Sequence, residues 1–512
     1  MGAIPPERIE QRDHRCERGA RMATRPNLLV LMSDQHNPHV MGCEGDTVVR
    51  TPHLDRLAAE GVLFENCYCP APLCVPSRMS FMTSRHPSGN EVWSNQCMLP
   101  SDAPTFAHAL GAAGYETVLN GRMHFMGADQ RHGFETRLAD TITCSYVGGM
   151  HKALRPELLA ATGQSRVAAT TAGPGRTGYQ GYDETVARAA VEFLRRRAAQ
   201  KDERPFCLVC GFVLPHCPFV CRREDFDYYL DRVTIPQFPP GYFETLHPAM
   251  RLWRKNRDIE DLTEEQIRRA RAGYYGLVEH FNRQLGKVLE ALDASGLAEN
   301  TMVVYTSDHG EMAGEHGMWW KSNFYEGAAS VPLIVSHPGR IAPGRRSGPI
   351  VNLIDIGPTL IQIAGADPLP DVPGRSLAPL LRGEDAEWRD ETFSEHHACL
   401  GLPPMRMVRS GPWKLVHFDG DRPQLFNLDD DPDEFCDLGE DPQHAGIRRE
   451  LTARVLADWS AAHMEQVLER RRRGHRLLAE WYRTVNPPLP EHWGDPPEAT
   501  VFPGEEYAGE DT

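Results

Sequence analysis

The sequence predicts an α/β fold: a large mixed, mainly parallel sheet sandwiched by helices, followed by a smaller C-terminal α+β domain. Short apolar runs alternate with amphipathic helical stretches over most of the chain, which is typical of an α/β sheet protein. The 512 residues also exceed the size at which one hydrophobic core stops growing. We therefore expect a polar N-terminal extension at 1–24, an α/β domain at 25–384 and an α+β domain with a tail at 385–512.

The elements of the large domain follow from its apolar runs and its helix-capping residues. Strands are expected at 27–32, 115–119, 205–213, 301–306 and 331–335. Helices are expected at 51–60, 105–113, 183–199 and 263–294. Asp183 is the expected N-cap of the third helix. Thr263 and Gln266 have the spacing of a capping box at the start of the fourth helix.

The pattern changes beyond residue 384. Two short strands are expected at 413–418 and 424–428, and one long charged helix at 447–482. The end of the chain is rich in Pro, Gly and acidic residues, which indicates a tail or an arm over a neighbour. Residues 1–24 are polar and lack the apolar segment of a secretory signal.

Charge and cysteine content narrow the function class. The formal net charge of −16 argues against nucleic-acid binding, because an acidic chain repels phosphates. It favours a small substrate over a polyanion for the same reason. No run reaches the ~18 apolar residues of a membrane span. Thirteen cysteines, an odd number spread along the chain, indicate reduced thiols. We expect a cytoplasmic protein that binds neither nucleic acid nor membrane.

Clusters of charged or metal-binding side chains follow the apolar strands. In open α/β sheets ligands bind at the carboxyl ends of the strands, so these clusters are expected to converge. For any single cluster, a solvated loop is the simpler interpretation. The clusters are Ser33-Asp34-Gln35-His36, Asn120-Gly121-Arg122-Met123-His124, Pro215-His216-Cys217-Pro218 and Ser307-Asp308-His309-Gly310.

A further cluster, Cys74-Val75-Pro76-Ser77-Arg78, precedes an apolar helical stretch. Pro76 suits the first turn of a helix, which places Cys74 at its positively polarised N-terminus. A free cysteine is more often a small buried apolar residue than a nucleophile. The surrounding clusters make the nucleophile hypothesis the stronger one here.

The string C-x-P-S-R resembles the signature of type I sulfatases, within the alkaline phosphatase superfamily. The likeness extends from about residue 25 to 440 and is greatest to choline sulfatase and its relatives. Gly121-Arg122-Met123-His124 resembles the family's G-K-x-H, and Ser307-Asp308-His309-Gly310-Glu311 its second metal loop. Thr51-Pro52-His53-Leu54-Asp55, Lys321 and Pro332-Leu333-Ile334-Val335 continue the match.

This resemblance implies a role for each matching residue. Cys74 would be converted to formylglycine by a maturation enzyme, and the hydrated aldehyde would supply the attacking oxygen. One divalent metal, Ca²⁺ first with Mn²⁺ or Mg²⁺ as alternatives, would be held by Asp34, Gln35, Asp308, His309 and the modified Cys74. Arg78 would brace the aldehyde hydrate, and His124 would hydrogen-bond its hydroxyl. Arg122, His216 and Lys321 would bind the sulfate or the leaving group, with His216 or Lys321 as general acid.

The implied function is hydrolysis of a small organic sulfate ester, choline-sulfate-like or aryl sulfate, to an alcohol and sulfate. Gln35 and His309 depart from the common ligands and also resemble phosphonate monoester hydrolases, so phosphonate monoester or phosphodiester hydrolysis is an alternative. A catalytically inactive binding protein is another. Arg122 replaces the usual lysine; instead of clamping sulfate, it could pair with a surface carboxylate such as Asp129. A homo-oligomer is an open alternative to a monomer.

Three further patterns have simpler structural interpretations. Cys207 and Cys210 are spaced as C-x-x-C, but residues three apart on a strand point to opposite faces. Trp319 and Trp320 are read as packing residues, with an aromatic wall for a quaternary ammonium as the alternative. The basic run at 470–473 is read as a solvated helix face.

Overall fold

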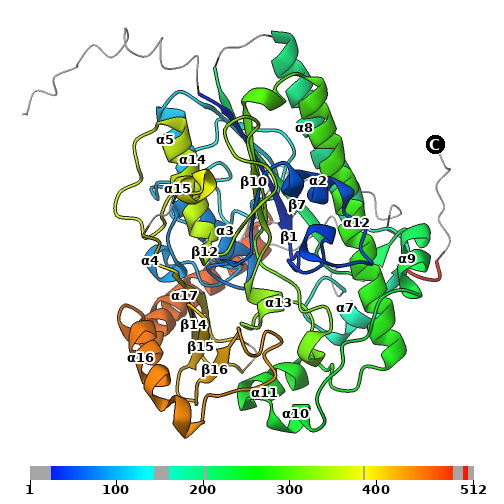
Figure 1. Cartoon of the computed structure of the whole chain (residues 1–512), viewed down its shortest axis with the longest axis vertical. Coiled ribbons are helices and arrows are strands. Elements are labelled where there is room, and N and C mark those ends of the chain that lie inside the picture. The colour runs from blue at the N-terminus through cyan, green and yellow to red at the C-terminus, as the bar shows by residue number, and fades with distance from the viewer. Residues whose placement is uncertain are drawn as a thin grey trace, which may run out of the picture.

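The computed structural model describes residues 25–142, 161–200, 204–384, 387–399, 401–487 and 500–505. The expected N-terminal extension and most of the expected tail lie outside these residues. Figure 1 shows a central sheet with helices on both of its faces, and a smaller sheet with two helices below it. The central sheet has eight strands in the order β11-β2-β10-β9-β1-β7-β4-β5.

Parallel strands form the middle of the large sheet. β1 (Asn27–Asp34) pairs in parallel with β7 (Phe206–Pro215) and β9 (Thr301–Ser307), and β4 (Glu116–Gly121) pairs in parallel with β7. β10 (Leu333–Ser336) runs antiparallel to β9. The outer strands are β2 (Val62–Phe64), β5 (Thr136–Arg137) and β11 (Arg345–Ser347). The mixed, mainly parallel sheet is confirmed, and its four parallel strands end at one edge.

Helices cover both faces of this sheet because its strands are apolar on both sides. Leu29 and Leu31 of β1 pack into one core, and Leu28 and Val30 into the other. The first core lies under α2 (Pro52–Ala59), α8 (Gly178–Gln200) and α12 (Glu264–Ala294). The second lies under α3 (Cys74–Thr83), α5 (Phe106–Ala112) and α14 (Ile356–Ala364) (Figure 1).

The capping residues of the two long helices were predicted with different success. Thr263 and Gln266 form the expected capping box of α12. The predicted cap at Asp183 is wrong, because α8 already begins at Gly178. The carboxylate of Asp183 instead accepts the backbone N–H groups of Val213 (2.8 Å) and Leu214 (3.1 Å). Aspartate is common at helix N-caps, but Asp183 accepts hydrogen bonds from backbone N–H groups at the end of β7 instead of from those at the start of a helix.

The C-terminal part contains a separate four-stranded antiparallel sheet. The expected strands are β15 (Trp413–Phe418) and β16 (Gln424–Asn427); β13 (Glu391–His396) and β14 (Met405–Ser410) were not predicted. The single long helix was wrong: the chain forms α16 (Ala445–Leu456) and α17 (Ala461–Val485). Ser460 caps α17 by accepting the backbone N–H of His463. A domain boundary near residue 384 stays a prediction.

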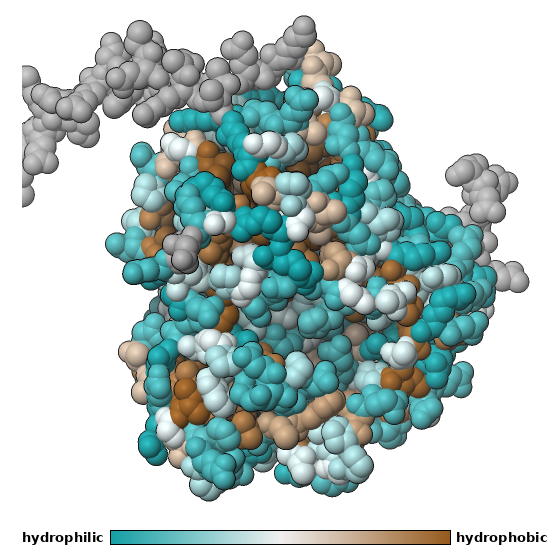
Figure 2. All heavy atoms as spheres, viewed as in Figure 1, coloured by the Kyte–Doolittle hydropathy of each residue, from teal (hydrophilic) through white to brown (hydrophobic). Residues whose placement is uncertain are grey.

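The surface of the molecule is mostly polar on the side shown in Figure 2, where hydrophilic residues cover most of the visible face and apolar residues lie in separate patches. The eleven cysteines within the described residues are free, and no described helix is long and apolar enough to cross a membrane. The remaining elements are η1 (Gly42–Glu44), β3 (Cys67–Tyr68), α4 (Pro87–Asn90), α7 (Arg166–Thr170), β6 (Gly173–Pro174), β8 (Val220–Cys221), α9 (Arg223–Leu230), α10 (Tyr242–Thr245), α11 (Pro248–Asn256), η2 (Ala298–Asn300), η3 (Glu315–Gly317), α13 (Glu326–Ala329), β12 (Val351–Asn352), η4 (Leu353–Asp355), α15 (Ala378–Arg382) and η5 (Pro442–His444).

Candidate active site

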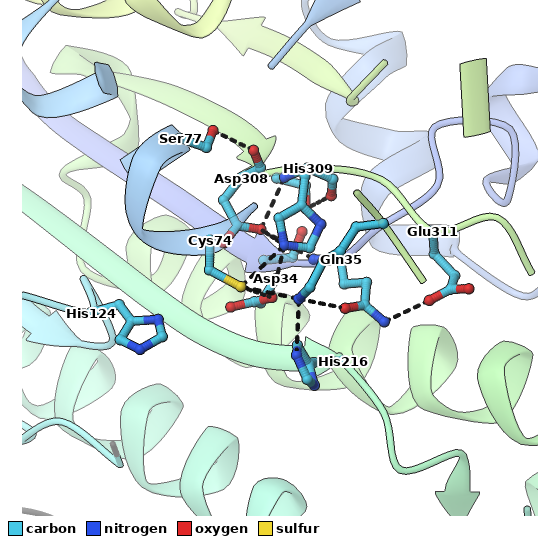
Figure 3. Close-up of polar contacts among 12 residues, drawn as sticks. Asp34, Gln35, Cys74, Ser77, His124, His216, Asp308, His309 and Glu311 are labelled. Atoms are coloured by element: carbon cyan, nitrogen blue, oxygen red, sulfur yellow. Dashed lines mark hydrogen bonds and ion pairs between the residues drawn. The ribbon is translucent and has the colours of Figure 1, made fainter. Parts of the chain in front are cut away.

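The polar side chains that follow the parallel strands meet at one edge of the sheet (Figure 3). Parallel pairing places Ser33 of β1 opposite Ser307 of β9, so that Asp34 and Asp308 come from neighbouring strands. On its other side, Asp34 is paired with Pro215, the residue before His216. The N-terminus of α3 brings Cys74 to the same place. The convergence expected from the sequence is therefore observed.

Four potential metal-binding side chains face one another at this edge. One donor atom each of Asp34, Cys74, Asp308 and His309 lies within 4.8 Å of the others. Cys74 Sγ is 3.6 Å from Asp34 Oδ1 and 3.2 Å from His309 Nε2. All four side chains are buried. Two carboxylates with one imidazole form a donor set suited to a divalent cation, so these residues fit the metal that the sequence implied.

The hydrogen bonds of His309 set its tautomer. Its Nδ1–H donates to the carbonyl of Gly310 (2.9 Å), which leaves the Nε2 lone pair directed at the carboxylates. Nε2 lies 3.6 Å from Oδ1 of both Asp34 and Asp308. Burial lowers the pKa of His309, which favours the neutral ring. A neutral imidazole held through its other nitrogen is the usual form of a metal-binding histidine.

Arg78 links the two buried carboxylates. Its Nε donates to Asp308 Oδ2 (2.7 Å) and its Nη2 to Asp34 Oδ2 (3.1 Å). Nη1 donates to the carbonyl of Arg122 (2.7 Å). None of these three charged side chains is exposed by more than a few per cent. Such charges are tolerated in a core only when they are paired and hydrogen-bonded, so Arg78 holds the carboxylates in position.

Arg122 lies inside the site. Its Nε donates to Asp34 Oδ2 (2.9 Å), and its Nη2 is 2.9 Å from His124 Nδ1. Its Nη1 is buried and has no hydrogen-bond partner among the described residues. The alternative pairing of Arg122 with Asp129 is wrong, because Asp129 contacts His132 instead.

The backbone around Arg122 is positioned by an unusually close approach of β4 and β7. The N–H of Arg122 donates to the carbonyl of Gly211 (2.7 Å). A Cβ at Gly211 would lie 1.7 Å from the carbonyl oxygen of Arg122, so only glycine fits there.

The charges around Asp34 determine its ionisation. Burial by itself raises the pKa of this carboxyl group. The nearby cations of Arg122, Arg78 and Lys321 lower the pKa by more than burial raises it. The pKa of Asp34 is therefore well below its usual value. Asp34 is a carboxylate throughout the physiological range and can serve as a charged ligand.

Lys321 joins Cys74 to the opposite wall of the site. Its Nζ donates to Gln35 Oε1 (2.8 Å) and Cys74 Sγ (3.1 Å), and lies 3.1 Å from His216 Nε2. Burial lowers the pKa of Lys321, but the negative groups around it raise it above its usual value. His216 Nδ1 donates to the carbonyl of Cys217 (2.7 Å), and burial and Lys321 lower the pKa of His216. Lys321 therefore holds the proton, and His216 is neutral.

Glu311 belongs to the site, although no role for it is predicted from the sequence. It accepts hydrogen bonds from Gln35 Nε2 (2.5 Å) and from the backbone of Ala313 (2.9 Å) and Trp320 (2.5 Å). Burial raises the pKa of Glu311 to about 7. By holding the amide nitrogen of Gln35, Glu311 turns the amide oxygen toward Lys321. Its signal in the sequence was its place two residues after His309.

Two sets of expected residues lie away from the cluster. Figure 3 shows His124 apart from Cys74, and its contact with the site runs through Arg122, whose Nη2 is 2.9 Å from His124 Nδ1. Trp319 and Trp320 are buried in the apolar core, where Trp319 packs on Phe219 (ring centroids 5.4 Å apart) and Trp320 on Trp253 (6.2 Å). The packing interpretation of both tryptophans agrees with these contacts.

Comparisons with known proteins agree with this site. A family model described as Sulfatase matches residues 26–366, and one described as N-sulphoglucosamine sulphohydrolase, C-terminal, matches residues 314–460. The chain is 35% identical over 452 residues to a choline-sulfatase of Rhizobium meliloti (strain 1021), covering 86% of this chain and 87% of that protein. It is 31% identical over 445 residues to arylsulfatase K of Xenopus laevis, covering 81% and 80%.

A solved structure shares the architecture. The crystal structure of a phosphonate monoester hydrolase of Agrobacterium radiobacter superimposes with a TM-score of 0.69 at 26% identity. The match covers 85% of this chain and 95% of that chain. The large sheet and the C-terminal sheet domain are thus found together in another protein of known structure.

Proposed function

The chain belongs to the sulfatase family, and on that premise we propose that it hydrolyses a small organic sulfate ester through a nucleophile made from Cys74. The observation that carries this proposal is the meeting of Cys74 Sγ with donor atoms of Asp34, Asp308 and His309 within 4.8 Å. A nucleophile beside a cation site has both the charge and the position that ester cleavage requires.

One divalent metal is proposed beside Cys74. Asp34, Asp308 and His309 would hold it, together with Gln35 Oε1 and the modified Cys74 side chain. Carboxylate and amide oxygens favour Ca²⁺, while the imidazole nitrogen raises the affinity for Mn²⁺. When bound, the metal supplies positive charge beside the nucleophile and the sulfate oxygens.

Conversion of Cys74 to formylglycine is the second part of the proposal. The hydrated aldehyde supplies the oxygen that attacks the sulfur atom of the ester. Cys74 is 1% exposed in the folded chain. A maturation enzyme therefore has to reach it before the surrounding structure has closed.

The remaining side chains would bind the sulfate and protonate the leaving group. Arg122 offers its unpartnered Nη1–H groups to a sulfate oxygen while Nε stays on Asp34. Lys321 holds its proton at Nζ and lies next to Cys74, so it is the better candidate to protonate the departing alkoxide. Neutral His216 accepts a hydrogen bond from Lys321 and orients it. His124 would act through Arg122, which it contacts.

The test combines mass spectrometry of the Cys74 peptide with turnover of two aryl esters. The proposal predicts an aldehyde at position 74 and faster hydrolysis of an aryl sulfate than of the matching aryl phosphonate. A faster reaction with the phosphonate would establish the alternative, phosphonate monoester hydrolysis, which the structural likeness to such an enzyme at 26% identity supports. An unmodified thiol with no turnover of either ester would indicate an inactive binding protein.

A further inference from the structure

A cavity of about 490 Å³ adjoins the site and has walls from both parts of the chain. Leu73 and Ser322 line it, and these are the chain neighbours of Cys74 and Lys321. Successive Cα atoms lie ~3.8 Å apart, so the cavity begins next to the nucleophile position. Its far wall is formed by the last residue of β13, by the residues that follow it and by α17. The cavity thus has on this side the chain neighbours of two residues of the candidate site.

The described lining of this cavity is basic. Arg257, Arg471 and Arg472 line it together with three histidines, and its described lining contains no aspartate or glutamate. The whole chain, by contrast, has a formal net charge of −16. A concentration of cations in a cavity of an acidic protein attracts anions there and repels cations.

Arg257 is the most unusual of these cations. It is 1% exposed, and its guanidinium group donates to Gln164 Oε1 (3.1 Å) and to the carbonyl of Trp253 (3.3 Å). It also lies over the ring of Trp253, 3.8 Å from the centroid. No carboxylate of the described residues forms an ion pair with it, and burial lowers its pKa to about 10. A buried guanidinium without an anion is costly, so the site is built for an anion that comes from outside.

The two arginines of α17 are less buried and have weak acidic neighbours. Arg471 lies 3.9 Å from Glu91 and donates to the carbonyl of Met98 (3.0 Å). Arg472 is half exposed and lies 3.3 Å from Glu469. The ion pair of Arg472 is exposed and that of Arg471 is long, and both kinds have small interaction energies, so both arginines remain able to attract a ligand.

A polar acceptor completes the cavity. His396 is 1% exposed, and its Nδ1–H donates to the carbonyl of His397 (2.7 Å). Its Nε2 is buried and has no hydrogen-bond partner in the described residues. Burial, with the neighbouring His397 and Arg257, lowers the pKa of His396 to about 3, so the ring is neutral. A hydroxyl group of a ligand would satisfy this nitrogen.

We propose that this cavity binds the alcohol portion of the sulfate ester, and that this portion carries an anionic substituent held by Arg257 with Arg471 and Arg472. The inference rests on the proposed sulfatase function and specifies its substrate class. The substituent is a carboxylate or a second sulfate, since both offer paired oxygens to a guanidinium fork. A quaternary ammonium such as choline would meet three like charges, which selects against it.

Three aryl sulfates test this selectivity. They are 4-(carboxymethyl)phenyl sulfate, its amide 4-(carbamoylmethyl)phenyl sulfate, and 4-(sulfomethyl)phenyl sulfate, whose sulfonate stands in for a second sulfate because it cannot itself be hydrolysed as an ester. The methylene group insulates the leaving oxygen, so the three differ mainly in charge. We expect kcat/KM to be about tenfold or more higher for at least one anionic ester than for the amide. The ratio between the two anions identifies which of them the cavity prefers, and choline sulfate should be the poorest substrate.

Substitutions of the cavity arginines test which residues cause the preference for anionic esters. Arg257→Gln should bring the ratio between the anionic ester and the amide to within about threefold, because kcat/KM falls more for the anionic ester than for the amide. Because Arg257 is buried, Arg472→Gln provides a second variant that keeps the core intact and should lower the ratio partially. Arg473→Gln, on the exposed side of the same helix, is the matched control and should leave the ratio unchanged.

Two outcomes would overturn the inference. The first is turnover of all esters, the amide and choline sulfate included, at similar kcat/KM. The second is an anion preference that survives in both cavity variants. The alcohols released from the first two esters are 4-hydroxyphenylacetate and its amide. Calorimetry can measure the binding of both alcohols without any turnover. If no sulfate ester is hydrolysed, the proposed function fails, and equal binding of these two alcohols would then reject the basic cavity independently.

Discussion

Two clusters of buried charge in this chain have opposite designs. At the strand ends, acceptor atoms of Asp34, Asp308 and His309 converge on Cys74. At the junction of the two sheets, Lys414 of β15 is fully buried between two acidic side chains, and its Nζ lies 2.6 Å from Glu326 Oε1 and contacts Glu434. Burial of charge is common to both. Only the first cluster directs several electron pairs at one point, and that arrangement, rather than burial, indicates a ligand.

The second cluster is closed by further hydrogen bonds. Tyr68 donates to Glu326 Oε2 (3.0 Å), and Arg409 Nε donates to the hydroxyl of Tyr68 (3.0 Å). The backbone N–H of Glu326 donates to Glu434 Oε2 (2.7 Å). These contacts join β3 and α13 of the large domain to β14 and β15 of the C-terminal sheet. The comparison predicts that changes in the first cluster affect catalysis and changes in the second affect stability.

The largest expected effect is that of Cys74→Ala. Loss of the nucleophile should reduce kcat by ~10³-fold or more, while the circular dichroism spectrum and the thermal midpoint stay near those of the parent. Cys207→Ala, which removes a buried thiol from the apolar core, is the control and should retain kcat within about twofold. Full activity of Cys74→Ala would contradict the proposed mechanism.

Metal removal should separate the two clusters next. Exhaustive chelation is expected to abolish turnover and to lower the thermal midpoint, because a ligand that binds only the folded state stabilises it. Added Ca²⁺ or Mn²⁺ should restore both. In Asp308→Asn the midpoint should no longer respond to the metal. Normal turnover by enzyme that metal analysis shows to be free of divalent ions would contradict the metal assignment.

The closed cluster is tested by Lys414→Met. Removing the cation leaves two carboxyl groups buried without their partner, and the free energy of unfolding should fall by about 3–5 kcal/mol. Denaturant unfolding measures this loss, and kcat per folded molecule should stay within about twofold. The double variant Lys414→Met/Glu434→Gln should recover part of the stability, since one buried charge is then removed. A large loss of kcat without loss of stability would break the distinction between the clusters.

These two clusters also differed in how far they were predictable. The strand-end cluster was foreseen because each apolar strand is followed directly by polar residues, and parallel strands end together. The second cluster depends on β14, where Arg406 and Arg409 are buried although arginine usually faces solvent. Such residues conceal the apolar alternation of a strand, and for this reason β14 was missed, as was β13, in which Glu395 is buried.

The basic cavity had no local signal at all. Arg257, His396 and Arg472 are far apart in the sequence, and only the packing of α17 against the large domain brings them together. The prediction of a solvated face for the run at 470–473 holds for Arg470, Arg472 and Arg473 but not for Arg471, whose side chain is 18% exposed. Periodicity predicts which face of a helix is apolar, but it does not predict which charged residue faces a cavity.

The smallest expected effect is that of Arg122→Lys, and substitutions of Arg122 are the finest test of the first cluster. The guanidinium group has one nitrogen on Asp34 and one buried nitrogen without a partner in the described chain. Arg122→Lys keeps the charge but cannot contact Asp34 and a sulfate oxygen through a planar fork, so kcat/KM should fall roughly tenfold, or ~1–2 kcal/mol. Arg122→Ala leaves developing negative charge uncompensated and should cost about 3 kcal/mol or more.

The two Arg122 substitutions together distinguish binding of sulfate from support of the metal. If Arg122 acts only by holding Asp34, the loss in both variants should be reversed by excess metal, because the weakened ligand is then saturated. If it also clamps the ester, the loss persists at saturating metal and appears in kcat. Steady-state kinetics with measured metal content decides between these results. Arg131, an exposed arginine that donates to the carbonyl of Glu135, is the matched control, and Arg131→Lys and Arg131→Ala should stay within about threefold of the parent.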